Sequence, residues 1–240
     1  MLIKDLPKDL QDALTRYFYT PYQGYVYLYN NLIVLKELER FAKDDCFYSL
    51  MSRDDTVDGK PSIWAQIFDA VFLFAFGKVG DVDLEANDCI LDVGSRIGEF
   101  SIPFTDFYIR SVTNTTVVAV EPELLPCKVQ QALVKIFERK NIEVVNSTIA
   151  SYLATSNREF SLVLMLNVFD HILRQGEDVA WRALDELSRR CGKMVLMAGP
   201  TDQMPQENIP QCVLKHSQYT AYRRLLSNSY GGRELWGFMR

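Results

Sequence analysis

The stretch "DCILDVGSRIGEFS" (Asp88–Ser101) joins a short apolar run to a turn that contains two glycines. A buried strand, a glycine turn and a helix in this order often hold a phosphate or a nucleoside. Gly94 permits a sharp turn, and Gly98 lets the next helix begin close to a ligand, which the backbone N–H groups of the turn would then face. An ordinary connection between strand and helix has the same pattern, so the rest of the chain has to decide.

Further apolar runs and helical patterns alternate after this stretch. Continuous apolar runs favour strands that are buried on both faces of a parallel sheet, and helical segments separate them here. This alternation predicts an α/β domain over residues 81–240 with a doubly wound, mostly parallel sheet. "RELWGFM" (Arg233–Met239) predicts a late strand at or near an edge, with little room for the first strand of a terminal hairpin. The other runs are "TVVAVE" (Thr116–Glu121), "IEVVN" (Ile142–Asn146), "SLVLML" (Ser161–Leu166) and "KMVLMAG" (Lys193–Gly199).

Residues 1–80 lack this alternation and predict a helical N-terminal extension that acts as a cap or lid. Asn31–Lys43 has apolar residues at helical spacing, and Ser62–Gly80 predicts a second, mostly buried helix. The segment from Arg16 to Asn31 is rich in tyrosine. These rings either stack on a sugar or aromatic acceptor or form a packing or homo-oligomer contact.

Composition narrows the function classes. The 240 residues are 48% hydrophobic and carry a formal net charge of -5, which gives no attraction to a nucleic-acid backbone. Five cysteines without a C-x-x-C pair, together with two histidines, predict no metal site. The charged N-terminus and the absence of a long apolar stretch predict neither a signal peptide nor a membrane span, so we expect a cytoplasmic protein.

Arg96 and Glu121 indicate which ligand the turn would hold. The dinucleotide fingerprint G-x-G-x-x-G needs a glycine where Arg96 stands, which argues against an oxidoreductase that binds a dinucleotide. Glu121 ends the second apolar run, where an acid accepts hydrogen bonds from both hydroxyls of a ribose. The alternative is an acid at a helix N-terminus ahead of Pro122.

"EFSLVLMLNVFDHILRQG" (Glu159–Gly176) contains the candidate reacting groups. The apolar run ends at Asn167, and Asp170 and His171 follow. A neutral imidazole at His171 would remove a proton from a hydroxyl or an amine. In the alternative, His171 packs against the cofactor or caps the next helix. Asp170 is a base, an orienting group or an acid of the turn.

Together, "ILDVGSRIGEFS", "VVAVEPE" and "FSLVLMLNVFDHIL" resemble class I methyltransferases that use S-adenosylmethionine (SAM), over residues 88–239. The resemblance implies SAM as cofactor, with Glu121 at its ribose and Asn167 near its sulfonium. The loop after the third run lacks the acid that often binds adenine, and Ser147 stands about there. At the methionine end, the resemblance implies Asp92, Gly94 and Gly98, and Ser95 in the same turn is a further candidate for cofactor binding.

The segment after Leu166 also bears on the substrate. It lacks an N-P-P-Y-like tetrad, which points away from amino groups of nucleic acids and toward the branch that modifies small molecules and saccharides. The predicted reaction is methyl transfer from SAM to a hydroxyl or amine of such an acceptor, with His171 and Asp170 as catalytic residues. The alternatives are a tRNA-modifying SAM-dependent enzyme and a catalytically silent SAM-fold binding protein.

Overall fold

The computed structural model describes most of the chain from Ile63 onward. The described residues are Lys8, 56–57, 60–61, 63–77, 88–98, 100–102, Thr105, 115–136, 139–199, 205–227 and 233–240. The tyrosine-rich segment, with its predicted oligomer contact, and the helix predicted over Asn31–Lys43 lie outside these residues.

Among the described residues, seven strands form one sheet in the order β5-β4-β3-β6-β7-β9-β8. The first five run parallel to one another, and β9 runs antiparallel to both of its neighbours. The predicted doubly wound, mostly parallel sheet is therefore confirmed. The strands are β3 (Cys89–Val93), β4 (Thr116–Glu121), β5 (Ile142–Asn146), β6 (Leu162–Leu166), β7 (Lys193–Ala198), β8 (Ala221–Leu226) and β9 (Glu234–Met239), and β1 (Thr56–Val57) and β2 (Lys60–Pro61) pair separately.

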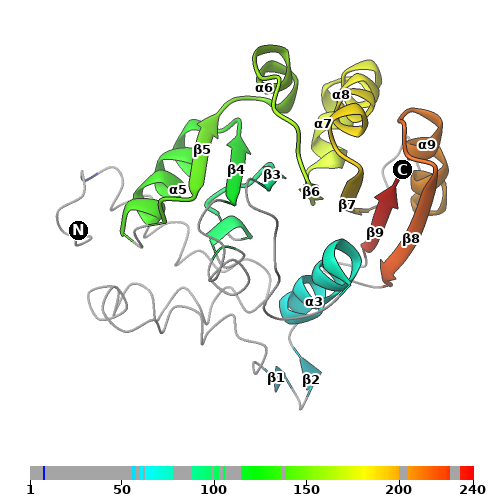
Figure 1. Ribbon diagram of the computed structural model, residues 1–240, viewed down its shortest axis with the longest axis horizontal. Helices are drawn as coiled ribbons and strands as arrows, with labels where there is room; N and C mark the ends of the chain where they lie inside the picture. The colour runs from blue at the N-terminus through cyan, green and yellow to red at the C-terminus, as the bar shows by residue number, and fades with distance from the viewer. Residues whose placement is uncertain are drawn as a thin grey trace.

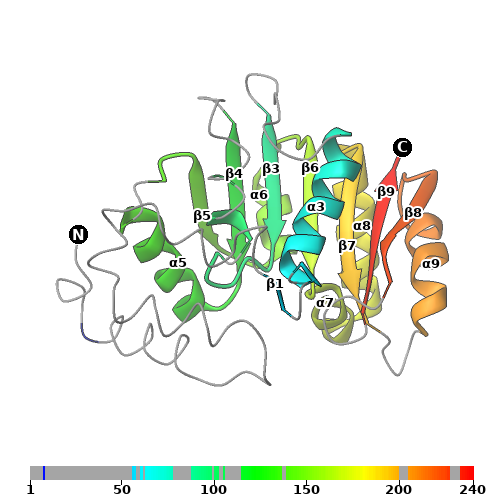
Figure 2. The same ribbon diagram turned by 90° about the horizontal axis from the view of Figure 1, so that it is seen from below.

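Helices cover both faces of the sheet (Figures 1 and 2). Because consecutive side chains of a strand point to opposite faces, Ile90 joins one apolar core and Leu91 joins the other. One face carries α3 (Ile63–Phe76) and α5 (Leu124–Ile136). The other carries α6 (Ile149–Thr155), α7 (Phe169–Gln175), α8 (Glu177–Arg190) and α9 (Ile209–Lys215), the last preceded by a 3₁₀ turn at Gln206–Asn208.

The C-terminal hairpin is complete. Its first strand is β8, which lies before "SNSYGG", so β9 runs between β7 and β8 and the sheet edge is β8. The expectation that little room remains for this strand is wrong. The sequence "AYRRLL" has no continuous apolar run and so no strand signal, because four of its six residues are exposed at the edge.

Helix α3 packs directly on the sheet, although it falls within the predicted N-terminal cap. A Cβ atom added to Gly237 of β9 would lie 2.4 Å from the ring of Phe74, so the missing side chain makes room for this aromatic ring. The predicted domain boundary at residue 80 stays a prediction.

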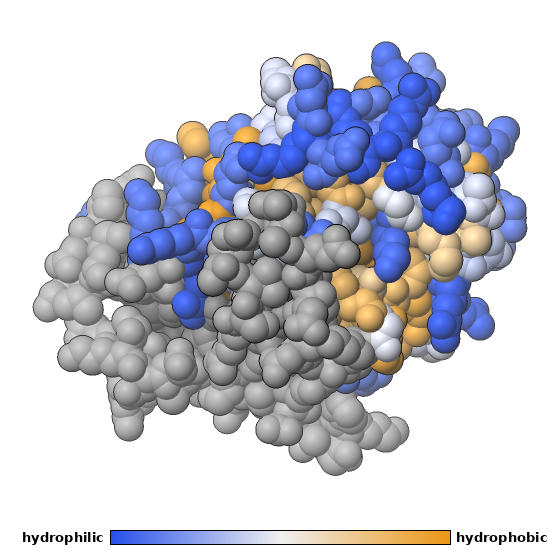
Figure 3. Space-filling model, in the orientation of Figure 1, coloured by the Kyte–Doolittle hydropathy of each residue, from blue (hydrophilic) through white to orange (hydrophobic). Residues whose placement is uncertain are grey.

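The outer surface of α3 is apolar. Figure 3 shows apolar side chains gathered over this helix and polar side chains over α8, and Leu73 of α3 is 54% exposed.

In the described part of the chain, no helix has both the length and the apolar character needed to cross a membrane.

Candidate functional site

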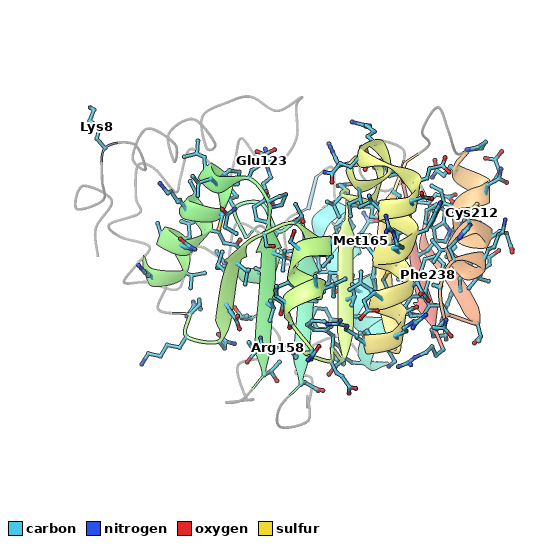
Figure 4. All side chains as sticks on the ribbon, turned by 90° about the horizontal axis from the view of Figure 1, so that it is seen from above. Lys8, Glu123, Arg158, Met165, Cys212 and Phe238 are labelled. Carbon is cyan, nitrogen blue, oxygen red and sulfur yellow. The ribbon has the colours of Figure 1, made fainter. Side chains whose placement is uncertain are left out.

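The predicted site residues gather at the carboxyl ends of the parallel strands. The turn with Gly94 follows β3, Glu121 ends β4, Ser147 follows β5 and Asn167 follows β6. The strand order reverses between β3 and β6, and open α/β sheets bind ligands at such a reversal. Figure 4 shows Glu123 at this end of the strands and Arg158 at the opposite end.

The two glycines of the turn permit close packing. Gly94 has φ 70° and Gly98 has φ 87°, in the left-handed region that favours glycine. A Cβ atom on Gly94 would lie 2.5 Å from Cγ2 of Val168, and one on Gly98 would lie 2.9 Å from Cδ1 of Ile102. Gly94 thus brings the turn after β3 against the segment after β6.

Four backbone N–H groups of the turn bond within the protein. Those of Gly94 and Ser95 donate to the carbonyl of Val120 at 2.8 and 3.2 Å, and that of Gly98 donates to the carbonyl of Ser95 at 2.8 Å. The N–H of Arg96 donates to Oε2 of Glu121 at 2.8 Å. The expectation that these four groups face a ligand is wrong, because the end of β4 supplies acceptors to three of them and the Ser95 carbonyl accepts from the fourth.

Glu121 is the ionisable group at the centre of this arrangement. Its carboxylate is buried and accepts N–H bonds at both oxygens, from Arg96 at Oε2 and from Glu123 at Oε1, each at 2.8 Å. Burial raises the pKa of the carboxyl above its usual value, although these two bonds act in the opposite direction. Each oxygen keeps a second lone pair, so the carboxylate fits two further donors such as the hydroxyls of a ribose.

Asp92 and Ser95 are buried beneath the turn. Ser101 donates a hydrogen bond to Oδ2 of Asp92, and Ser95 donates to Oε1 of Gln130 at 2.8 Å. Nε2 of Gln130 is buried and has no hydrogen-bond partner among the described residues. These bonds tie the turn to β3 and α5, while contact of Asp92 and Ser95 with a cofactor stays a prediction.

The loop after β5 is bonded to the backbone of Glu121. The N–H of Ser147 donates to the Glu121 carbonyl at 3.2 Å, and Nδ2 of Asn146 donates to the same carbonyl at 2.9 Å. The Ser147 hydroxyl donates to the carbonyl of Thr148 at 3.0 Å. This places Ser147 beside Glu121, and its contact with adenine stays a prediction.

The segment after β6 contains a polar cluster. Asn167 has φ 59° and accepts a hydrogen bond at Oδ1 from Nη1 of Arg233 at 2.5 Å. Asp170 is 4% exposed, and its Oδ2 lies 3.1 Å from Nη2 of Arg174 and 3.8 Å from Nη2 of Arg233. His171 is exposed at the start of α7. Arg233 was not anticipated from the sequence, because no local pattern marks it.

No metal cluster accompanies these residues. In the described segments, no group of three His, Cys, Asp or Glu side chains is arranged to hold a metal ion. The site offers hydrogen-bond donors and acceptors, the buried carboxylates of Asp92, Glu121 and Asp170, and an exposed imidazole.

Comparison with known proteins identifies the fold. No protein-family model and no curated protein matches the chain. A crystal structure of WbdD is 18% identical with a TM-score of 0.58, over 96% of this chain and 46% of that chain. The N-terminal domain of EvdMO1 with SAH (S-adenosylhomocysteine) bound is 13% identical with a TM-score of 0.56, over 86% of this chain and 97% of that chain.

A third structure is the precorrin-6y C5,15-methyltransferase from Geobacter metallireducens. It is 14% identical with a TM-score of 0.50, over 78% of this chain and 92% of that chain. The chain spans less than half the length of WbdD, which another structure describes as a bifunctional kinase-methyltransferase. The chain has the fold of class I SAM-dependent methyltransferases.

Proposed function

We propose that the chain is a SAM-dependent methyltransferase that binds SAM at the carboxyl ends of β3, β4 and β6. The observation that carries this proposal is Glu121, whose buried carboxylate lies beside the glycine turn and keeps lone pairs for two hydroxyls. SAH in a neighbour of the same fold supports an adenosyl ligand. Arg96, at the position that the dinucleotide fingerprint gives to glycine, argues against NAD.

Positioning is the main task of such a site. When bound, SAM supplies a methyl group on a positively charged sulfur. A nucleophile attacks the methyl carbon in line with the carbon–sulfur bond, which breaks as the new bond forms. Glu121 would hold the ribose, and Asn167 would lie near the sulfonium end. Because the segments with these residues are hydrogen-bonded to the neighbouring strands β5 and β7, the protein can hold the reactants without large rearrangement.

We further propose a small molecule or saccharide as acceptor, methylated at a hydroxyl or an amine. The exposed imidazole of His171 would accept the proton that such a group loses on methylation. The contacts of Asp170 favour its role as an orienting group over that of a base, since its buried carboxylate pairs with two guanidinium groups. A tRNA acceptor has less support, because the chain has a formal net charge of -5.

Ligand-dependent stability tests the cofactor. SAM or SAH at about 100 times its dissociation constant should add roughly 2.7 kcal/mol to the free energy of unfolding, whereas NAD should add none. Glu121→Ala should abolish this stabilisation. Glu123→Ala is the matched control, because Glu123 is an exposed acid two residues away and bonds to Glu121 through its backbone. Stabilisation by NAD alone, or a full response to SAM in Glu121→Ala, would refute the proposed site.

Turnover tests the acceptor and the base. SAH formation from SAM would be measured against saccharides, small hydroxyl and amine compounds, and tRNA. We expect His171→Ala to lower turnover and leave SAM affinity unchanged. Unchanged turnover would remove His171 as base, and methylation of tRNA would favour the RNA alternative. SAM binding without turnover on any acceptor would favour a silent binding protein.

A further inference from the structure

Arg233 connects the terminal hairpin to the turn after β6. Its Nη1 donates to Oδ1 of Asn167 at 2.5 Å, and its Nη2 lies 3.8 Å from Oδ2 of Asp170. Arg174 reaches the same carboxylate oxygen at 3.1 Å. Of these residues, Arg233 links the buried carboxylate of Asp170 to the side chain of Asn167.

The register of β9 brings Arg233 to this place. Ala198 of β7 pairs with Glu234 of β9, so Arg233 lies just beyond the paired residues, at the carboxyl end of β7. A Cβ atom on Gly199 would lie 3.1 Å from Cγ of Arg233 and 3.2 Å from its Nε. The stem of Arg233 therefore crosses Gly199, and the absence of a side chain there lets it pass.

Asn167 is held from two directions. Its φ of 59° lies in the left-handed region, which asparagine tolerates better than most residues that have a Cβ atom. Its backbone N–H donates to the carbonyl of Met197 in β7 at 2.9 Å, while its side chain accepts from Arg233. The guanidinium is in turn oriented by Asp170, which is 4% exposed.

We propose that Arg233 is a positioning residue of the SAM site, which acts by holding the side-chain amide of Asn167 in one orientation. The ligand in this statement rests on the proposed function, whereas the link between Arg233 and Asn167 is a property of the chain itself. Arg233 stands 66 residues from Asn167 and outside all three motifs that resemble methyltransferases. The hairpin would thereby contribute to cofactor binding without touching the cofactor.

Two substitutions at Arg233 separate charge from geometry. Arg233→Met removes the guanidinium, and Arg233→Lys keeps the charge but loses the planar pair of donors. We expect the dissociation constant of SAH, measured by calorimetry, to rise at least fivefold in the Met variant and less in the Lys variant. Amide hydrogen exchange in peptides that cover residues 166–175 should become faster. Gly199→Ala should give a weaker form of both effects by displacing the stem of Arg233.

Arg224→Met is the matched control. Arg224 lies in β8 of the same hairpin and pairs with Glu234 at 3.3 Å, away from Asn167. We expect it to change neither SAH affinity nor exchange over residues 166–175. An equal affinity loss in this variant would assign the effect to hairpin stability and overturn the inference.

The outcomes distinguish this inference from the proposed function. If wild type binds SAH and Arg233→Met binds it within twofold of wild type, the positioning role is wrong and the methyltransferase proposal stands. If wild type binds neither SAH nor SAM, the proposed function fails. In that case, amide hydrogen exchange still tests whether Arg233 holds Asn167 in place. Faster exchange over residues 166–175 in Arg233→Met supports this link, and unchanged exchange overturns it.

Discussion

Gly94→Ala tests the contact between the turn after β3 and the segment after β6. The added Cβ atom would lie 2.5 Å from Cγ2 and 2.8 Å from Cβ of Val168, well inside van der Waals contact. Gly94 also has φ 70°, where a side chain strains the backbone whatever the space around it. The substitution therefore combines a backbone cost with a steric cost.

The chain offers a control that separates the two costs. Gly77 has φ 74° and nothing within 4 Å of its added Cβ atom, so Gly77→Ala carries the backbone cost alone. That cost is roughly 1–2 kcal/mol, and overpacking adds about 1–3 kcal/mol at Gly94, for a total of about 2–5 kcal/mol. At about 2–4 °C per kcal/mol, Gly94→Ala should lower Tm by about 4–20 °C and Gly77→Ala by about 2–8 °C.

Urea and thermal unfolding of the ligand-free protein would measure both variants. Val168→Ala in the Gly94→Ala background should relieve part of the steric cost, because it removes the Cγ2 atom at 2.5 Å but leaves Cβ at 2.8 Å. If Gly94→Ala is no less stable than Gly77→Ala, the turn moves away from Val168 without cost. The close approach would then not be what Gly94 provides.

Three further predictions concern single groups. Because the pKa of Glu121 is raised in the folded state, the folded protein holds the proton of this carboxyl more tightly than the unfolded chain does. The free energy of unfolding, relative to that of Glu121→Gln, should therefore fall as the pH rises through that pKa, while SAH affinity should rise. Urea titrations and calorimetry over a pH series measure the two quantities, and flat profiles would contradict the prediction. Asn167→Ala should have a free energy of unfolding in urea about 1 kcal/mol lower than Asn167→Gly, because glycine adopts the left-handed φ of 59° freely. Equal stability of the two variants would show that the backbone at residue 167 is not strained. Burial raises the pKa of Cys191 to about 11, so iodoacetamide at neutral pH should label the half-buried Cys212 before Cys191, which mass spectrometry would show or disprove.

The parallel part of the sheet was predictable because its strands carry their own signal. A strand covered on both faces needs apolar side chains throughout, and all five residues of β3 are buried. Strand β8 lacks that signal because it pairs on one side only, and its residues from Ala221 to Arg224 are exposed. Its partner β9 was recognised as a strand, but its place inside the sheet depends on β8.

The positions of the site residues were easier to predict than their contacts. Gly94, Glu121 and Asn167 each end or follow an apolar run, and parallel strands bring such ends to one edge of the sheet. The prediction that the turn N–H groups face a ligand was wrong for residues 94–96, because their acceptors, the Val120 carbonyl and the Glu121 carboxylate, belong to the neighbouring strand. Periodicity locates a strand end but does not say which groups of adjacent ends satisfy one another.

Residues 167 and 168 lie where two long-range contacts of the site meet. Val168 packs against the turn after β3 through the space left by Gly94, and Asn167 accepts a hydrogen bond from Arg233, just before β9. The first contact comes from a motif visible in the sequence, and the second requires the pairing of Ala198 with Glu234. The segment after β6 is thus fixed by the strand next to it in the sheet and by a hairpin far along the chain. A change in the hairpin therefore reaches the proposed SAM site through Asn167, one residue away from the contact made by the glycine turn.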